Sequence, residues 1–225
     1  MDTAHVSLII LLLRKSGFEH YRCDRNVNLG LSLSSLGKIL KAAGPDDILT
    51  LQAGEKSDYL TILFEGKNDR MCEYDLKLMN IDADHLGVPE PEYDAIVTMS
   101  SAEFKRICTD MKEISDNLTL SIDKEGIKFS VDGDIGTGSV TLKAGSGGSI
   151  DEKDEYEDTT TKIEVSKAVS VVLASKYLCN FAKATPLSKQ VSLSVSNDIP
   201  MLVQYRIGEI GHVRYYLAPK MDDEE

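Results

Sequence analysis

Apolar positions recur with the period of an α-helix in three stretches of the chain. The three sets are Leu36, Ile39, Leu40 and Ala43; Phe104, Ile107, Cys108 and Met111; and Ala174, Tyr177, Leu178 and Phe181. Each set follows the spacing i, i+3, i+4, i+7, which places its members on one face of a helix. Serines stand at or near the start of each set, where a hydroxyl can cap free backbone N–H groups. The pattern predicts three helices, each with one buried face.

Runs of alternating or β-branched residues surround each predicted helix. One run precedes each helix, at 28–33, 95–99 and 169–173. The runs that follow the helices are 47–52 and 59–65; 117–122, 127–131 and 138–143; and 190–195, 201–207 and 213–218. The chain thus repeats a strand–helix–strand–strand–strand unit. Single helices spaced among many strands predict an α+β fold with antiparallel sheets.

The chain begins with strand-like sequence that no predicted helix precedes. Residues 5–14 and 17–24 have the character of the closing strands of a further unit, whose opening strand–helix–strand segment we expect to be missing here. The apolar run 6–13 is too short to cross a bilayer, which takes about 20 apolar residues. It also lacks the basic start and small-residue cleavage site of a signal peptide. We therefore expect a buried strand.

Two acidic stretches interrupt the periodic pattern. Residues 80–94 contain two prolines and five acids, and they predict a connector between an N-terminal domain, 1–79, and a C-terminal domain, 95–225. Residues 144–160 are rich in glycine, serine and acids, which predicts a surface loop inside the second domain.

The formal net charge is −12, which at first argues against a nucleic-acid partner. However, the acids concentrate in the connector, in the loop 150–158 and in the last four residues, so the rest of the chain is slightly basic. On a helical projection, Lys105 and Lys112 lie away from the apolar stripes, together with five further cations: Lys38, Lys41, Arg106, Lys176 and Lys183. A solvated helix face explains any one helix. Because Lys38, Arg106 and Lys176 share one register in the repeats, we favour a common basic surface that contacts phosphates without reading bases.

The sequence contains no recognisable metal-binding or catalytic signature. The four cysteines are far apart without a CxxC pair, and the four histidines are mutually remote. Residues 133–138, GDIGTG, lie between strands and are typical of a turn rather than of a nucleotide-binding loop. The sequence predicts reduced thiols, no metal, no cofactor and no enzymatic activity.

Several longer strings are similar to one family. They are HVSLIILLL, YRCDRN, SLGKILKAAG, LGVPEPEY, AEFKRICTD, FAKATPLS and GHVRYYLAPKMDDEE. Across essentially its whole length the chain resembles the proliferating cell nuclear antigen family, the eukaryotic DNA sliding clamps. This resemblance implies a DNA-clamp fold with two similar domains per subunit. Three subunits would join head to tail, with sheets outside and helices lining a ring around duplex DNA.

The chain departs from the family pattern in three places. Met1 matches a methionine inside the family's first domain, so the opening strand–helix–strand segment is lacking. Thr109 stands where many relatives have a basic residue, and Glu113 weakens the cationic character of the same helix. The resemblance nevertheless assigns DNA contact to the five cations named above.

The resemblance also implies contacts between subunits and a modification site. The edge strand 72–79, with Tyr74, Leu76 and Leu78, would pair with Ser139, Val140 and Leu142 of a neighbouring subunit. Both segments could instead be ordinary interior strands, although unpaired edges invite association. Lys124 matches the family's modifiable lysine, and an ordinary surface lysine in a turn explains it equally well.

A partner groove is the last element that the resemblance implies. Its residues would be Met1, His5, Val6, Leu86, Val88, Pro89, Pro200, Tyr216, Leu217, Ala218 and Pro219. Independently, Leu86 and Val88 are apolar residues in an acidic connector, and exposed apolar residues rimmed by charge mark interaction sites. The expected ligand is a short motif with a glutamine and two aromatic residues.

Two functions remain open at this point. The first is a nuclear, homotrimeric processivity factor for DNA polymerase that tethers polymerases, the clamp loader and repair proteins to duplex DNA, with no membrane partner. The alternative is a truncated, monomeric peptide-binding module that cannot close a ring.

Overall fold

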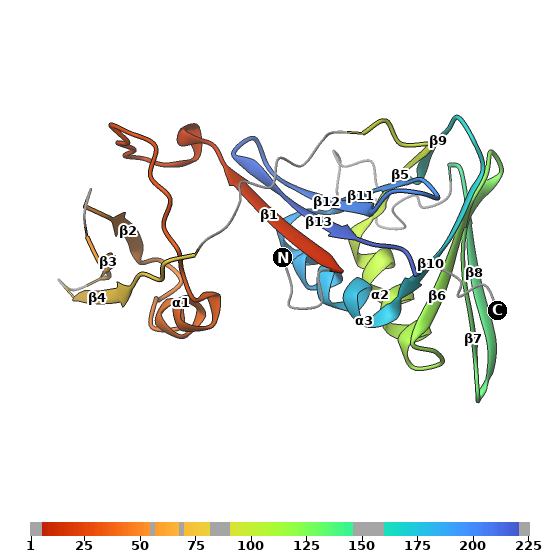
Figure 1. Ribbon diagram of the computed structural model, residues 1–225, viewed down its shortest axis with the longest axis horizontal. Coiled ribbons are helices and arrows are strands. Elements are labelled where there is room, and N and C mark those ends of the chain that lie inside the picture. The colour runs from red at the N-terminus through yellow and green to blue at the C-terminus, as the bar shows by residue number, and fades with distance from the viewer. Residues whose placement is uncertain (1–5, 55–56, 68–69, 82–90, 146–159, 221–225) are drawn as a thin grey trace. The chain divides into compact units, whose positions relative to one another are not determined.

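The computed structural model describes residues 6–54, 57–67, 70–81, 91–145 and 160–220. It divides into two compact units (Figure 1). One unit is Arg22–Pro89, and the other joins Met1–Tyr21 to Glu90–Glu225. The fold is the mixed α+β arrangement of antiparallel strands and single helices that the repeats predict.

The larger unit contains two antiparallel sheets. The six-stranded sheet has the order β1-β13-β12-β11-β5-β9, and the four-stranded sheet has the order β10-β6-β7-β8. The strands are β1 Ser7–Leu13, β5 Ala95–Ser100, β6 Asn117–Ile122, β7 Gly126–Gly133, β8 Gly136–Lys143, β9 Lys162–Val165, β10 Val169–Ala174, β11 Gln190–Val195, β12 Met201–Ile207 and β13 Gly211–Leu217. The helices are α2 Ser101–Lys112 and α3 Ser175–Phe181, and short 3-10 turns span Lys15–Gly17 and Ala182–Leu187.

In the second and third repeats, the strand that precedes the helix pairs with a strand of the other repeat; we call this an exchange of leading strands. β5, which leads into α2, pairs with β11 of the third repeat, with Ala95 opposite Val195. β10, which leads into α3, pairs with β6 of the second repeat, with Val169 opposite Ile122. Each sheet therefore contains strands from both repeats, and the two repeats bury one shared core.

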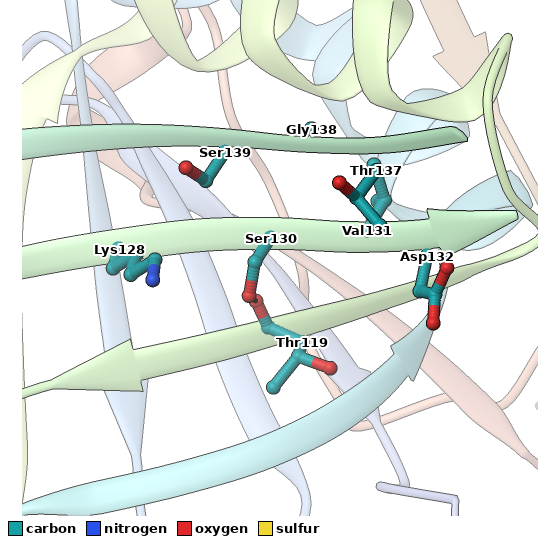
Figure 2. A pocket seen from close by; sticks show the side chains of 8 residues that line it. All are labelled: Thr119, Lys128, Ser130, Val131, Asp132, Thr137, Gly138 and Ser139. Carbon is teal, nitrogen blue, oxygen red and sulfur yellow. Dashed lines mark hydrogen bonds between the residues drawn. The ribbon is translucent and has the colours of Figure 1, made fainter.

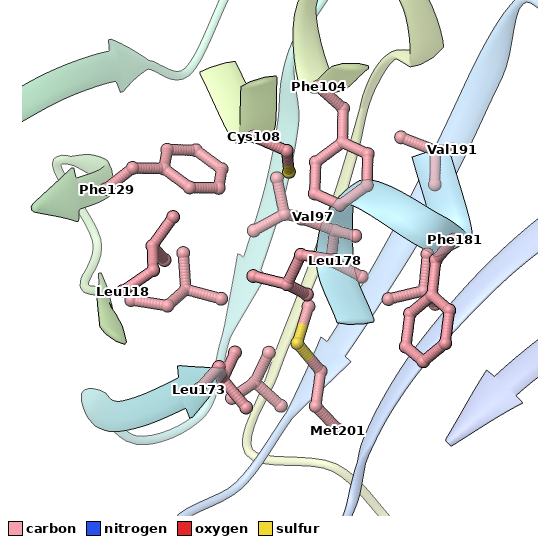
Figure 3. Packing of buried hydrophobic residues seen from close by; sticks show 14 of the residues in the cluster. Val97, Phe104, Cys108, Leu118, Phe129, Leu173, Leu178, Phe181, Val191 and Met201 are labelled. Atoms are coloured by element: carbon pink, nitrogen blue, oxygen red, sulfur yellow. The ribbon is translucent and has the colours of Figure 1, made fainter. Parts of the chain in front are cut away.

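That core contains the apolar stripes of α2 and α3. Phe104, Cys108, Leu178 and Phe181 are each 2% exposed or less and pack with the inward residues of both sheets (Figure 3). Ser100 caps α2 because its Oγ accepts a hydrogen bond from the Glu103 N–H at 3.4 Å. The predicted buried stripe is confirmed in full for α2; in α3 it is confirmed for Leu178 and Phe181, whereas Tyr177 is partly buried and Ala174 belongs to β10.

The smaller unit carries one helix on a three-stranded sheet. Its elements are α1 Leu33–Leu40, β2 Ile48–Gln52, β3 Tyr59–Glu65 and β4 Met71–Lys77, in the sheet order β2-β3-β4. Leu60, Ile62, Phe64 and Leu76 form its buried core, and Leu36 and Ile39 of α1 pack against it. Ser32 Oγ caps α1 by accepting from the Ser35 N–H at 3.3 Å.

Two predicted strands are not present. The run 28–33 makes a single bridge, Gly30 to Met79, because Ser32 already caps α1 and Leu33 belongs to the helix. Residues 17–24 contain the end of a 3-10 turn and bends rather than a strand.

The prediction of a strand at 6–13 is confirmed, but the prediction of its burial is wrong. β1 pairs over its full length with β13, from Ser7 opposite Leu217 to Leu13 opposite Gly211. Yet Ile9 and Leu11 are 56% and 58% exposed. The physical reason is that, among the described elements, β1 makes extensive contact with β13 alone, so no helix or second sheet packs over its apolar face.

Candidate nucleic-acid interface and partner groove

The five predicted DNA-contacting cations are all exposed. Lys38 lies in the last turn of α1, and Lys41 is the residue that ends this helix. Arg106 lies on α2, Lys176 on α3, and Lys183 on the 3-10 turn that follows α3. The larger unit thus brings three of the five onto neighbouring elements, since Cys179 Sγ of α3 donates to the Cys108 carbonyl of α2 at 3.1 Å.

Acids on α2 compensate part of its positive charge. Arg106 Nη2 lies 2.9 Å from Glu103 Oε1, one turn earlier. Lys112, which the helical projection places on the cationic face but the family resemblance does not assign to DNA, forms an ion pair with Asp116 just after the helix. The i,i+3 and i,i+4 spacings of these pairs were visible in the sequence and could have revealed them. The Thr109 hydroxyl donates to the Lys105 carbonyl at 2.8 Å, so it is used within the helix.

The predicted groove residues that the structure describes gather where β1 and β13 meet. The Ala218 N–H donates to the Val6 carbonyl at 3.0 Å, and Pro219 is half-buried beside it. Pro200 is exposed at the start of β12. Met1, His5, Leu86, Val88 and Pro89 lie outside the described residues. Tyr216 is 8% exposed and Leu217 has no exposed surface, so Leu217 belongs to the core and not to an accessible groove wall.

Tyr93, which sequence reasoning did not single out, lies beside one of the predicted groove residues, Pro200. Its hydroxyl donates to the Pro200 carbonyl at 3.2 Å. Burial, together with the nearby Tyr216, raises the pKa of Tyr93 to about 12, against the opposing effect of Arg214. Its only sequence signal was an aromatic ring in an acidic connector.

Hydrogen bonds of Asp94 also fix the connector immediately after Tyr93. The Asp94 N–H donates to Ser196 Oγ at 2.8 Å, and the Asp94 carbonyl accepts from the Ser166 N–H at 2.8 Å and from Ser166 Oγ at 2.9 Å. Residues 93 and 94 therefore fix the end of the connector beside the 196–200 loop.

Tyr93→Phe tests the role of this hydroxyl through pH dependence. The phenol ionises at a pKa of about 10 when unfolded and about 12 when folded, so the folded state holds its proton longer. The free energy of unfolding should therefore fall between pH 10 and 12, and this fall should be smaller in Tyr93→Phe. Urea unfolding across this range measures the effect. The exposed Tyr59→Phe is the control, and an equal change in both variants would contradict the prediction.

Lys124 is at the tip of a fixed turn between β6 and β7. Asp123 Oδ1 accepts from the Glu125 N–H at 2.8 Å and from the Gly126 N–H at 3.0 Å, which holds the turn and leaves Lys124 exposed. A shallow depression of about 320 Å³ lies beside it and includes Val165, Ser166 and Ala168. The geometry leaves the ammonium group accessible.

The predicted subunit-contact residues lie on two edge strands. β8 is an edge of the four-stranded sheet and β4 an edge of the three-stranded sheet. On β8, Val140 and Leu142 are half-buried against the core, whereas Ser139 lines a shallow polar depression on the outer face with Thr119, Lys128, Ser130, Asp132 and Thr137 (Figure 2). On β4, Tyr74 meets the Phe64 ring edge-on at 5.8 Å, Leu76 is buried and Leu78 is half-buried.

The cysteines of the chain are present as thiols and not as disulfides. All four cysteines are free, and burial raises the pKa of the Cys108 thiol. The described part of the chain holds no group of three or more His, Cys, Asp or Glu side chains arranged for a metal ion. None of the described helices has the length and apolar character that a bilayer span requires.

Family comparison covers nearly the whole chain. Residues 1–86 match the profile of the proliferating cell nuclear antigen N-terminal domain, and residues 87–220 match the profile of the C-terminal domain. The junction between the two matches falls inside the predicted connector, 80–94.

Proposed function

Since the chain belongs to the proliferating cell nuclear antigen family, which has a sliding-clamp type of function, we propose that it closes with two further copies into a ring around duplex DNA. In this role it acts without enzymatic activity as a processivity factor for DNA polymerase. The observation that carries the proposal is the antiparallel pairing of β1 with β13.

The repeats allow the same pairing to be formed between copies. β1 precedes the repeat that ends in β4, and β8 precedes the repeat that ends in β13. β1 pairs with β13, whereas β8 and β4 are both sheet edges. Pairing β8 of one copy with β4 of the next would reproduce the β1–β13 geometry. Neither strand would then remain an unpaired sheet edge. A head-to-tail contact of this kind generates a ring when its rotation closes.

DNA contact is proposed for Lys38, Lys41, Arg106, Lys176 and Lys183. All five are exposed on helices or helix ends, where ammonium and guanidinium groups can reach phosphates. Such contacts carry no sequence information, so the clamp can hold DNA and still move along it. Topological linkage then raises the local concentration of any bound partner at DNA.

Partner binding is proposed for the surface near Val6, Tyr93, Pro200, Ala218 and Pro219. These residues provide apolar contact area, and they lie beside the end of the connector, which hydrogen bonds hold in place. The occupants would be polymerases, the clamp loader and repair proteins that carry short glutamine–aromatic motifs. These partners imply a location in the nucleus and roles in replication and repair, with Lys124 available for modification.

Retention on circular DNA tests the ring directly. After loading by an ATP-dependent clamp loader, the chain should stay on a nicked circular plasmid through gel filtration in high salt. It should be lost when the plasmid is linearised, because a ring slides off a free end. Equal retention on circular and linear plasmid would indicate ordinary surface binding, and equal loss from both would show that the loaded protein does not encircle DNA.

One observation favours a second candidate, a monomeric peptide-binding module. Ile9 and Leu11 of β1 and Leu49 and Leu51 of β2 are all more than 45% exposed, so apolar surface near the N-terminus lacks cover among the described residues. Incomplete burial lowers stability and could prevent a ring from closing. The measurement that separates the two candidates is the oligomeric state.

A further inference from the structure

Four lysines surround the junction between α2 and α3. Lys112 ends α2, Lys176 lies on α3, Lys183 on the following 3-10 turn, and Lys220 follows β13. We call this set the lysine seam. The Cys179–Cys108 hydrogen bond fixes the two helices against each other at its centre.

Contacts at Asp116 and Asn117 bring three of these lysines together. Lys112 pairs with Asp116, the Ser175 N–H beside Lys176 donates to the Asp116 carbonyl at 2.9 Å, and Lys220 Nζ donates to Asn117 Oδ1. Burial has the largest effect on the Cys179 thiol and raises its pKa, whereas Lys112 and Lys183 both lower it. The pKa of Asp116 is lowered first by its hydrogen bond to Lys112 and further by the charges of Lys112, Lys220 and Lys176. These electrostatic effects agree with the contacts at Asp116 and Asn117, and Lys183 follows Cys179, on whose thiol it acts, by four residues.

Three of the seam lysines are held by uncharged partners. Lys176 Nζ lies 4.9 Å from the centre of the Tyr177 ring, Lys183 Nζ donates to Asn180 Oδ1 at 2.9 Å, and Lys220 Nζ bonds to Asn117 Oδ1. These contacts orient the side chains without neutralising them, and the Asp116 carboxylate also interacts with the charges of Lys176 and Lys220. Oriented cations lose less side-chain freedom when they meet an anion.

Lys112 differs because its partner is a carboxylate. Its ammonium group pairs with Asp116 Oδ1, and its side chain is 35% exposed while that of Asp116 is 84% exposed. Glu113 is the other acid near the seam, and its charge acts on Cys179. An exposed i,i+4 pair is weak, so a stronger anion can replace the carboxylate.

We propose that the lysine seam binds a phosphate of the DNA backbone and that Lys112 reaches this phosphate by leaving Asp116. This inference rests on the proposed function and adds a contact to α2. Within α2, Arg106 is paired with Glu103 and Thr109 offers no charge, so Lys112 is the residue through which α2 contributes a cation to the seam. Asp116 acts as a counter-ion that weakens binding when DNA is absent from the seam.

The test is equilibrium binding of the full chain to a fluorescein-labelled linear duplex, followed by anisotropy at several NaCl concentrations. Lys112→Gln should reduce the slope of log affinity against log salt by about 0.9, the effect of one lost phosphate contact. Lys112→Arg should keep the slope. The control is Lys128→Gln on β7, which makes the same charge change on the outer sheet face and should leave the slope unchanged.

Asp116→Asn separates an exchange of partners from simple repulsion. It should strengthen DNA binding in the unaltered chain and have no effect in the Lys112→Gln background. Equal strengthening in both backgrounds would show that Asp116 only repels DNA, which overturns the inference. If Lys112→Gln leaves the slope of log affinity against log salt unchanged, the inference is also overturned, but the proposed function stays intact. If the unaltered chain does not bind the duplex at any salt concentration, the proposed DNA contacts fail together with the seam.

Discussion

In sedimentation velocity, the unaltered chain is expected to migrate as a trimer, and Val140→Lys is expected to convert it to a monomer of 24.8 kDa. Val140 lies in the middle of the free edge strand β8, half-buried against the core. Pairing with β4 of a neighbour would enclose its side chain, and a lysine there would bring an unpaired charge into the contact. Loss of one of three identical contacts opens a ring, and loss of all three separates the subunits.

The matched control is Leu187→Lys, which places the same charge on an apolar residue of the 3-10 turn that is 46% exposed. It should leave the trimer intact. Circular dichroism and urea unfolding of both variants would show that each remains folded. A trimeric Val140→Lys would move the subunit contact away from β8. A monomeric unaltered chain would favour the peptide-binding alternative.

The second large expected effect is a difference between substitutions at Leu217 and at Pro219, which are two residues apart: the first should lower stability and the second should weaken binding. Leu217→Ala should lower the free energy of unfolding by about 2–5 kcal/mol, because it leaves a cavity at a position with no exposed surface. Pro219→Asp should change this free energy by about 0.5 kcal/mol or less, because its side chain is half-exposed. Its expected effect is on binding.

Titration with a synthetic peptide that contains one glutamine and two aromatic residues measures that effect. Pro219→Asp should weaken binding at least tenfold, a loss of about 1.4 kcal/mol, because a carboxylate would face apolar side chains of the peptide. Ile135→Asp makes the same kind of change at a turn residue that is 78% exposed, and it should bind normally. Unchanged affinity in Pro219→Asp would place the groove elsewhere.

The helices and most strands could be predicted from the sequence because an element with one buried face has apolar residues at regular spacing. The stripe from Phe104 to Met111 is buried along α2 for this reason. β9 was missed because Ile163 and Val165 are its only apolar residues and an acidic stretch precedes it. For β1, the composition indicated that its residues could be buried, but it carried no information on whether a neighbouring element covers them.

Parts of the site depended on tertiary contacts that no local pattern records. The exposure of Lys176 and Arg106 followed from the helical period. The burial of Leu217 and the bond from Tyr93 to Pro200 depend on which segments meet across more than a hundred residues. The exchange of β5 and β10 between repeats was equally hidden, since alternation reveals which face of a strand is buried but not which strand lies beside it.

That exchange also limits how the C-terminal domain can be taken apart. Removing the third repeat would delete β11 and β10, so β5 and β6 would each lose a partner strand. Removing the second repeat would delete β5 and β6, so β11 and β10 would each lose a partner strand. Either deletion leaves strands without partners and half of a hydrophobic interior facing water. The smallest transplantable module in this part of the chain is therefore the pair of repeats, residues 91–220.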